Sequence, residues 1–124
     1  MTSFKTTLVV GATEKTDRYA NKAIKLLNAK MHPVLAYGRR SGKVGNTEIV
    51  TDLGSFKNIP IDTVTLYINP THQTELYKAI IDLKPKRVIF NPGTENPEFE
   101  TLLNENNIET EEACTLVLLN TRQY

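Results

Sequence analysis

The chain has 124 residues, 40% of them hydrophobic, which is enough for one domain over residues 1–124 with one core. Its 15 basic and 14 acidic side chains leave a formal net charge of +1, which argues against a nucleic-acid or membrane-surface partner. The one cysteine, Cys114, excludes an internal disulfide and favours a reducing compartment. Met1 to Lys5 carry no apolar leader run, and no apolar stretch approaches membrane-spanning length, so we expect a cytoplasmic protein.

Short apolar runs alternate with segments of helical periodicity in the first half of the chain. Residues 6–10 form a continuous run rich in β-branched side chains, which predicts a strand buried on both faces. Residues 19–31 predict a helix, because Ile24, Leu27 and Met31 recur at helical spacing. The remaining predicted elements are a strand over 33–37, a basic loop over 38–46, a short strand over 47–50 and a helical turn over 53–56.

The second half of the chain repeats this alternation. Its predicted elements are strands over 63–68, 87–90 and 108–110, and helices over 71–83, 97–107 and 111–119. The first two strands each end at an Asn-Pro pair, and Glu111 and Glu112 would favour the first turn of the last helix. The whole pattern predicts the α/β class, as a Rossmann-like three-layer α/β/α sandwich with a mainly parallel sheet and a central first strand.

In such a sheet, ligands bind beyond the carboxyl ends of the strands, near the point where the strand order reverses. The rule selects the loops over residues 11–18, 38–43, 69–71 and 91–96. The first loop has only Gly11 of the three glycines in a dinucleotide fingerprint. Its backbone N–H groups and the Thr13 hydroxyl precede a helix and would suit a phosphate. The alternative is that Gly11 only permits a tight turn.

The second loop carries cations where an NAD site would carry an acid for the ribose hydroxyls. Gly38 is followed by Arg39 and Arg40, and Lys43 comes shortly after. Arginines here suit a phosphate on the ribose, as found in NADP at the 2′ position and in coenzyme A at the 3′ position. The missing glycines and the absence of a substrate domain favour coenzyme A. The alternative is an exposed basic loop with no ligand.

Several stretches of the chain resemble the small stand-alone CoA-binding domain proteins, which share a fold with the CoA-binding part of succinyl-CoA synthetase. The matching stretches include Val9-Val10-Gly11-Ala12-Thr13, Asp17-Arg18-Tyr19-Ala20, Gly38-Arg39-Arg40, Ile68-Asn69-Pro70 and Phe90-Asn91-Pro92-Gly93-Thr94-Glu95-Asn96. The resemblance runs nearly the whole length and implies CoA binding. The chain departs from the family pattern at Met31, commonly a glycine, at Leu35-Ala36-Tyr37-Gly38-Arg39, commonly Pro-Val-Asn-Pro, and at Phe90-Asn91-Pro92-Gly93, often Trp-x-Gln-x-Gly.

These patterns together predict non-catalytic binding of coenzyme A or an acyl-CoA. The alternative is a small NADP-dependent or other nucleotide-using enzyme that a partner chain completes. The predicted cofactor-binding residues are Gly11, Ala12, Thr13, Lys15, Arg18, Tyr19, Gly38, Arg39, Arg40, Lys43, Asn69, Pro70, Asn91, Pro92 and Gly93.

No catalytic residue is predicted, and His32, His72 and Cys114 do not have metal-ligand spacing. Residues 116–119 are apolar on every side of the predicted last helix, which predicts a homodimer with these residues at or near its interface.

Overall fold

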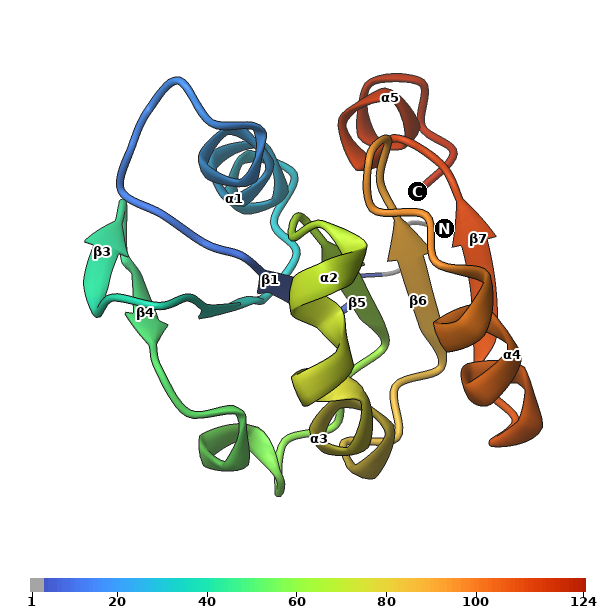
Figure 1. Ribbon diagram of the computed structural model, residues 1–124. Helices are drawn as coiled ribbons and strands as arrows, with labels where there is room; N and C mark the ends of the chain where they lie inside the picture. The colour runs from blue at the N-terminus through green and yellow to red at the C-terminus, as the bar shows by residue number, and fades with distance from the viewer. Residues whose placement is uncertain (1–3) are drawn as a thin grey trace.

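The computed structural model describes residues 4–124, so Met1 to Ser3, part of the segment in which no leader run was expected, lie outside the described residues. A seven-stranded sheet runs through the molecule in the order β3-β4-β2-β1-β5-β6-β7 (Figure 1). Every neighbouring pair is parallel except β3 with β4. The strands are β1 (Thr7–Val10), β2 (Val34–Tyr37), β3 (Gly42–Val44), β4 (Thr47–Val50), β5 (Thr63–Leu66), β6 (Arg87–Phe90) and β7 (Glu109–Glu112).

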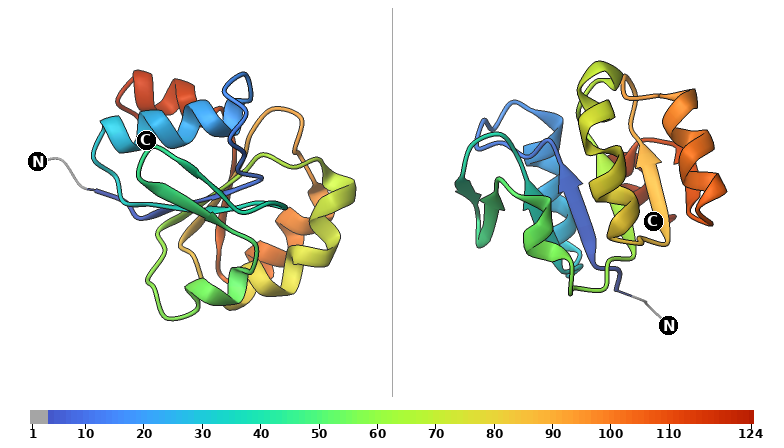
Figure 2. Two further views of the ribbon diagram at one scale, coloured as in Figure 1. Left: turned by 90° about the vertical axis from the view of Figure 1, so that its left-hand side faces the viewer. Right: turned by 60° about the horizontal axis from the view of Figure 1, so that its bottom comes forward.

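Helices cover both faces of this sheet, which confirms the Rossmann-like α/β class (Figure 2). One face carries α1 (Tyr19–Ala29) and α5 (Thr115–Asn120). The other carries the 3₁₀ turns η1 (Leu53–Phe56) and η2 (Thr74–Leu76) with the helices α2 (Pro70–Gln73), α3 (Tyr77–Asp82) and α4 (Pro97–Glu105). The chain therefore builds a central sheet between two helical layers, with β1 in the middle.

The central strand β1 divides its side chains between the two layers. Leu8 and Val10 pack with η1, α3 and α4, whereas Val9 packs with α1, and all three are fully buried. This two-sided burial explains why the strand is a continuous apolar run in the sequence. The strand order reverses at β1, because the chain leaves it for β2 on one side and returns to β5 on the other. The carboxyl ends of β1 and β5 therefore mark the expected place of a ligand.

Two predicted helices end or break earlier than their periodicity suggested. The helix over 19–31 stops at Ala29, and Met31 lies beyond it with φ of 69° and 72% of its surface exposed. Met31 therefore does not belong to the buried face of α1, although its spacing from Ile24 and Leu27 is helical. The helix over 71–83 is divided into α2, η2 and α3, with the fully buried Gln73 at the end of α2.

The predicted terminal helix over 111–119 is wrong in its first half. Glu111 and Glu112 belong to the edge strand β7, which pairs with β6, and the helix α5 begins only at Thr115. Charged side chains on an edge strand protect its free backbone groups from pairing with another sheet. The acids that seemed to suit a helix dipole serve this edge instead.

The basic loop over 38–46 contains a strand that the sequence did not predict. Residues Gly42–Val44 pair antiparallel with β4, and Gly45, at φ of 59°, helps to turn the chain between them. Val44 is buried against Ile49 in the α1 layer of the core. The resulting hairpin holds the end of the second loop beside the first.

Within residues 4–124, the longest apolar helical segments fall short of what a membrane span requires.

Candidate functional site

Two hollows lie side by side at the carboxyl ends of β1 and β5. We call the first the arginine pocket, of about 400 Å³, lined by Gly11, Ala12, Thr13, Glu14, Lys15, Arg39, Arg40, Ser41 and Ile68. We call the second the tyrosine pocket, of about 410 Å³, lined by Gly11, Thr13, Lys15, Arg18, Tyr19, Ala20, Tyr67, Ile68, Asn69, Pro92, Gly93 and Thr94. Since Gly11, Thr13, Lys15 and Ile68 line both, the two pockets form one groove across the end of β1.

Close backbone approaches build the middle of this groove. Gly11 has φ of 98°, and a Cβ there would stand 2.9 Å from Cγ2 of Ile68 and 3.0 Å from the carbonyl of Tyr67. A Cβ on Gly38 would stand 2.4 Å from the carbonyl oxygen of Ala12. The N–H groups of Gly11 and Ala12 both donate to the carbonyl of Tyr37, at 2.9 and 2.8 Å. The loops after β1, β2 and β5 therefore touch through their main chains, and glycine is required where they meet.

Cations surround the arginine pocket. The side chains of Lys15, Arg39 and Arg40 are exposed at its rim. Nη2 of Arg39 lies 3.0 Å from Nδ1 of His72, so this arginine reaches from the loop after β2 to α2. Guanidinium and ammonium groups converging on a cleft suit a phosphate, since guanidinium can bind two of its oxygens at once.

An acid closes the outer side of the arginine pocket. Oε2 of Glu14 accepts a hydrogen bond from the backbone N–H of Lys43 at 2.9 Å. A Cβ on Gly42 would stand only 2.6 Å from Cδ of Glu14, so the carboxylate packs directly on the hairpin. Glu14 thereby links the loop after β1 to β3, and its carboxylate is engaged by the backbone of that strand.

Fewer charged side chains line the tyrosine pocket than line the arginine pocket. Its walls come from the start of α1 at Tyr19, from the end of β5 at Tyr67 and Ile68, and from the loop after β6 at Gly93 and Thr94. Burial raises the pKa of Tyr67 to about 12, so its phenol stays neutral near pH 7. The Tyr67 hydroxyl is itself buried, so the pocket presents aromatic carbon and backbone groups, with Lys15 and Arg18 at its mouth.

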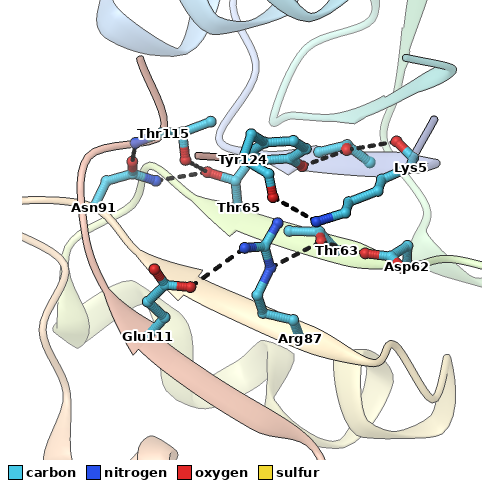
Figure 3. Close-up of polar contacts among 10 residues, drawn as sticks. Lys5, Asp62, Thr63, Thr65, Arg87, Asn91, Glu111, Thr115 and Tyr124 are labelled. Atoms are coloured by element: carbon cyan, nitrogen blue, oxygen red, sulfur yellow. Dashed lines mark hydrogen bonds and ion pairs between the residues drawn. The ribbon is translucent and has the colours of Figure 1, made fainter. Parts of the chain in front are cut away.

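Asn91 lies behind the wall of the tyrosine pocket and lines neither pocket. Only 2% of its surface is exposed. Its Nδ2 donates to Oγ1 of Thr65 at 2.6 Å, and its Oδ1 accepts from the N–H of Thr115 at 2.9 Å (Figure 3). The same Nδ2 also donates to the carbonyl of Leu66 at 2.8 Å. The amide of Asn91 thus joins β5, β6 and α5 and holds the base of the loop that continues into Pro92.

A second polar network lies at the opposite end of the same sheet face (Figure 3). Arg87 donates from Nε to Oγ1 of Thr63 at 3.1 Å and forms an ion pair with Glu111 at 3.3 Å. Its guanidinium lies under the ring of Tyr124, with Cζ 4.7 Å from the ring centroid, and the Tyr124 hydroxyl hydrogen-bonds to Oγ1 of Thr7. These contacts fasten the end of the described chain to the sheet, far from the groove.

Most of the predicted cofactor-binding residues line the groove. They are Gly11, Ala12, Thr13, Lys15, Arg18, Tyr19, Arg39, Arg40, Asn69, Pro92 and Gly93. Four others lie next to it without lining it, namely Gly38, Lys43, Pro70 and Asn91. Six lining residues were not predicted from the sequence, namely Glu14, Ala20, Ser41, Tyr67, Ile68 and Thr94. Tyr67 and Ile68 were assigned to a strand that in fact ends at Leu66. The loop after β5, which lines the groove, therefore begins two residues earlier than expected.

Over the described part of the chain, no three His, Cys, Asp or Glu side chains are grouped to hold a metal ion. Cys114 is a free, half-buried thiol directly before α5. The lining of the groove offers cations, backbone groups and aromatic rings, which would suit an anionic, partly apolar ligand.

The fold and the groove define a Rossmann-like domain with a ligand cleft at its topological switch point. The sequence profile of the CoA binding domain family matches residues 5–120, and the chain belongs to that family. No curated protein sequence matches the chain.

Solved structures share the fold over almost the whole chain. One, of an uncharacterized protein, is 45% identical with a TM-score of 0.91 and covers 99% of this chain and 100% of its own. A Thermus thermophilus protein is 25% identical with a TM-score of 0.86, over 98% of this chain and 91% of its own. A hypothetical protein from Pyrococcus horikoshii is 24% identical with a TM-score of 0.83, over 97% and 84%, and shares the fold.

Proposed function

We propose that this protein binds coenzyme A, or an acyl-CoA, in the groove and does not transform it. The observation that carries the proposal is the arginine pocket, where Lys15, Arg39 and Arg40 line one hollow at the end of β1. Membership of the CoA binding domain family supports the same ligand class. A ligand with a phosphate on its ribose matches these cations better than one whose ribose is free.

In this proposal the ligand lies along the groove with its two ends in different pockets. The ribose 3′-phosphate lies against Arg39 and Arg40, and the diphosphate lies over the backbone N–H groups at Thr13 with Lys15 beside it. The pantetheine arm enters the tyrosine pocket between Tyr67 and Thr94. Charge recognises the nucleotide end, and shape and burial recognise the uncharged arm.

The second candidate is a small enzyme that uses NADP or another nucleotide and is completed by a partner chain. The same arginines that suit a 3′-phosphate would suit the 2′-phosphate of NADP. Titration calorimetry with coenzyme A, dephospho-CoA, NADP and NAD separates the two candidates. We expect coenzyme A to bind and NAD not to bind. A protein that binds NADP and not coenzyme A would replace the first candidate with the second.

The role of the arginines is tested by comparing coenzyme A with dephospho-CoA, which lacks the 3′-phosphate. A charge-assisted contact contributes about 1.5–3 kcal/mol, so dephospho-CoA should bind at least about tenfold more weakly. The double variant Arg39→Ala with Arg40→Ala should lose this preference. A control with the same charge change, Lys57→Ala with Arg122→Ala, should keep it. Equal affinities of the unmodified protein for the two ligands would refute the assignment of Arg39 and Arg40.

We also propose that the protein is a cytoplasmic homodimer that uses the exposed side of α5. Val117 keeps 54% of its surface exposed, while Leu116 and Leu118 are half-buried and Leu119 is in the core. The apolar side that a partner copy could cover is therefore narrower than the sequence predicted, and it centres on Val117. Light scattering should report the mass of two chains, and Val117→Glu should reduce it to one. A single-chain mass at micromolar concentration for the unmodified protein would refute the dimer.

A further inference from the structure

One fully buried side chain joins the two walls of the tyrosine pocket from behind. Gln73, at the end of α2, has no exposed surface. Its Nε2 donates to the carbonyl of Ile68 at 3.0 Å and to the carbonyl of Thr94 at 2.8 Å. Ile68 and Thr94 both line the tyrosine pocket, one from the loop after β5 and the other from the loop after β6. A single amide nitrogen thus holds two different loops of the groove.

The other end of the same amide is tied to a helix. Oε1 of Gln73 accepts a hydrogen bond from Nδ2 of Asn96 at 3.0 Å. Oδ1 of Asn96 caps α4 by accepting from the N–H of Phe99 at 3.1 Å, and its Nδ2 also donates to the Tyr77 hydroxyl at 2.8 Å. Tyr77 stacks on Phe99 with ring centroids 4.3 Å apart. The side-chain oxygen of Gln73 is therefore held by the N-cap residue of α4, which in turn contacts Tyr77 of α3.

Burying an uncharged amide is unfavourable unless its hydrogen bonds are made. In Gln73 both amide hydrogens and the oxygen are used, and two of the three partners are main-chain groups of the groove. An apolar side chain of the same length could fill the space but could not hold the two carbonyls. The buried amide therefore constrains the spacing of the two loops, which packing alone would leave adjustable.

We infer that Gln73 is a positioning residue that sets the width of the tyrosine pocket without touching the ligand. The inference rests on the proposed function for the identity of the ligand that this pocket receives. It makes the uncharged arm of the ligand depend on Gln73 more than the nucleotide end does, because Thr94 lines only the tyrosine pocket, whereas Ile68 lines both pockets. Gln73→Met, which keeps the length and loses every hydrogen bond, should separate these two dependences.

The first measurement is amide hydrogen exchange in the free protein. The N–H of His72 donates to the carbonyl of Asn69, and the N–H of Thr94 donates to the carbonyl of Asn91, so each reports one of the two loops. In Gln73→Met both amides should exchange about tenfold faster or more, beyond any change shared by the core strands. The control is a variant of Ile108, a core residue just before β7 at the other edge of the sheet. The control is whichever of Ile108→Val and Ile108→Ala lowers the unfolding midpoint by the same amount as Gln73→Met.

The second measurement compares coenzyme A with adenosine 3′,5′-bisphosphate, which lacks the uncharged arm. We expect Gln73→Met to bind coenzyme A about tenfold more weakly while its affinity for the bisphosphate stays within about twofold. The Ile108 control should change neither affinity. An equal loss for both compounds, or exchange at His72 and Thr94 that only follows the core, would overturn the inference.

Two outcomes are kept apart by this design. If the unmodified protein binds neither compound, the proposed function is refuted, and the exchange comparison alone decides whether Gln73 holds the two loops. If Gln73→Met does not fold, Asn96→Asp takes its place, because it keeps the cap of α4 and removes the donor to Gln73. The same preferential weakening of coenzyme A over the bisphosphate is then expected, and its absence counts against the inference.

Discussion

The close approach at Gly11 allows the cost of one added methyl group to be worked out from the structure. Alanine at φ of 98° would be strained, which costs about 1–3 kcal/mol. Its Cβ would also lie 2.9 Å from Ile68 and 3.0 Å from the carbonyl of Tyr67, so packed groups must shift at a cost of about 1–3 kcal/mol. Gly11→Ala should therefore lower the free energy of unfolding by about 2–6 kcal/mol.

Gly45 offers a matched control because it shares the strain without the crowding. Its φ is 59°, and a Cβ there would meet nothing within 4 Å. Gly45→Ala should cost only about 1–2 kcal/mol, the usual cost of a left-handed alanine. Urea unfolding of both variants, followed by circular dichroism, measures the difference as a shift in midpoint at constant slope. If the two variants lose the same stability, the crowding at Gly11 is not real and the reasoning about the groove's backbone is wrong.

Two further predictions concern side chains away from the groove. Tyr124→Phe should lower the free energy of unfolding, measured in urea, by about 1 kcal/mol, because the ring stays and the hydrogen bond to Thr7 is lost. A loss above about 3 kcal/mol would mean that more than this bond is broken. Burial and the neighbouring Glu112 raise the pKa of Glu100 above its ordinary 4.5, so the folded protein holds more protons there and stability falls as pH rises through this window. Glu100→Gln should therefore be more stable at pH 7, by less than about 1 kcal/mol, and no more stable below pH 4.5, with the exposed Glu109→Gln as control.

The fold was predictable from the sequence where buried elements have a recognisable apolar pattern. The continuous run of β1 and the apolar stripe of α1 with Ile24 and Leu27 both follow from the local pattern. The sequence Glu109–Glu112 has no such pattern, since three of its four residues are acids and the segment lies at the sheet edge. Its strand state comes from hydrogen bonds to β6, a partner about twenty residues earlier in the chain. The local sequence pattern offered only the acids, which favoured the first turn of a helix.

The residues of the groove also divide into those that the sequence could predict and those that it could not. Its charged rim was predictable because a switch-point rule chooses the loops and Arg39 and Arg40 are conspicuous within them. The side chains that shape its walls were not predictable, because their roles depend on contacts between distant loops. Nothing in the local pattern marks Gln73 for burial, and its hydrogen bond to the carbonyl of Thr94 comes from a residue 21 positions later. Asn91 stands in a loop chosen for binding, yet its amide is used on Thr65 and Thr115.

The two halves of the groove should consequently respond differently to salt. Arg39 and Arg40 are exposed, so ions screen their attraction for a phosphate. The walls at Ile68 and Thr94 are held by the buried amide of Gln73, which ions do not reach. Coenzyme A should thus bind more weakly as sodium chloride is raised, and the double arginine variant should flatten that dependence. Gln73→Met should lower the affinity at every salt concentration and leave the slope unchanged. A slope that changes with Gln73, or that is not reduced when both arginines are removed, would show that the groove is not divided between charge at one end and fixed shape at the other.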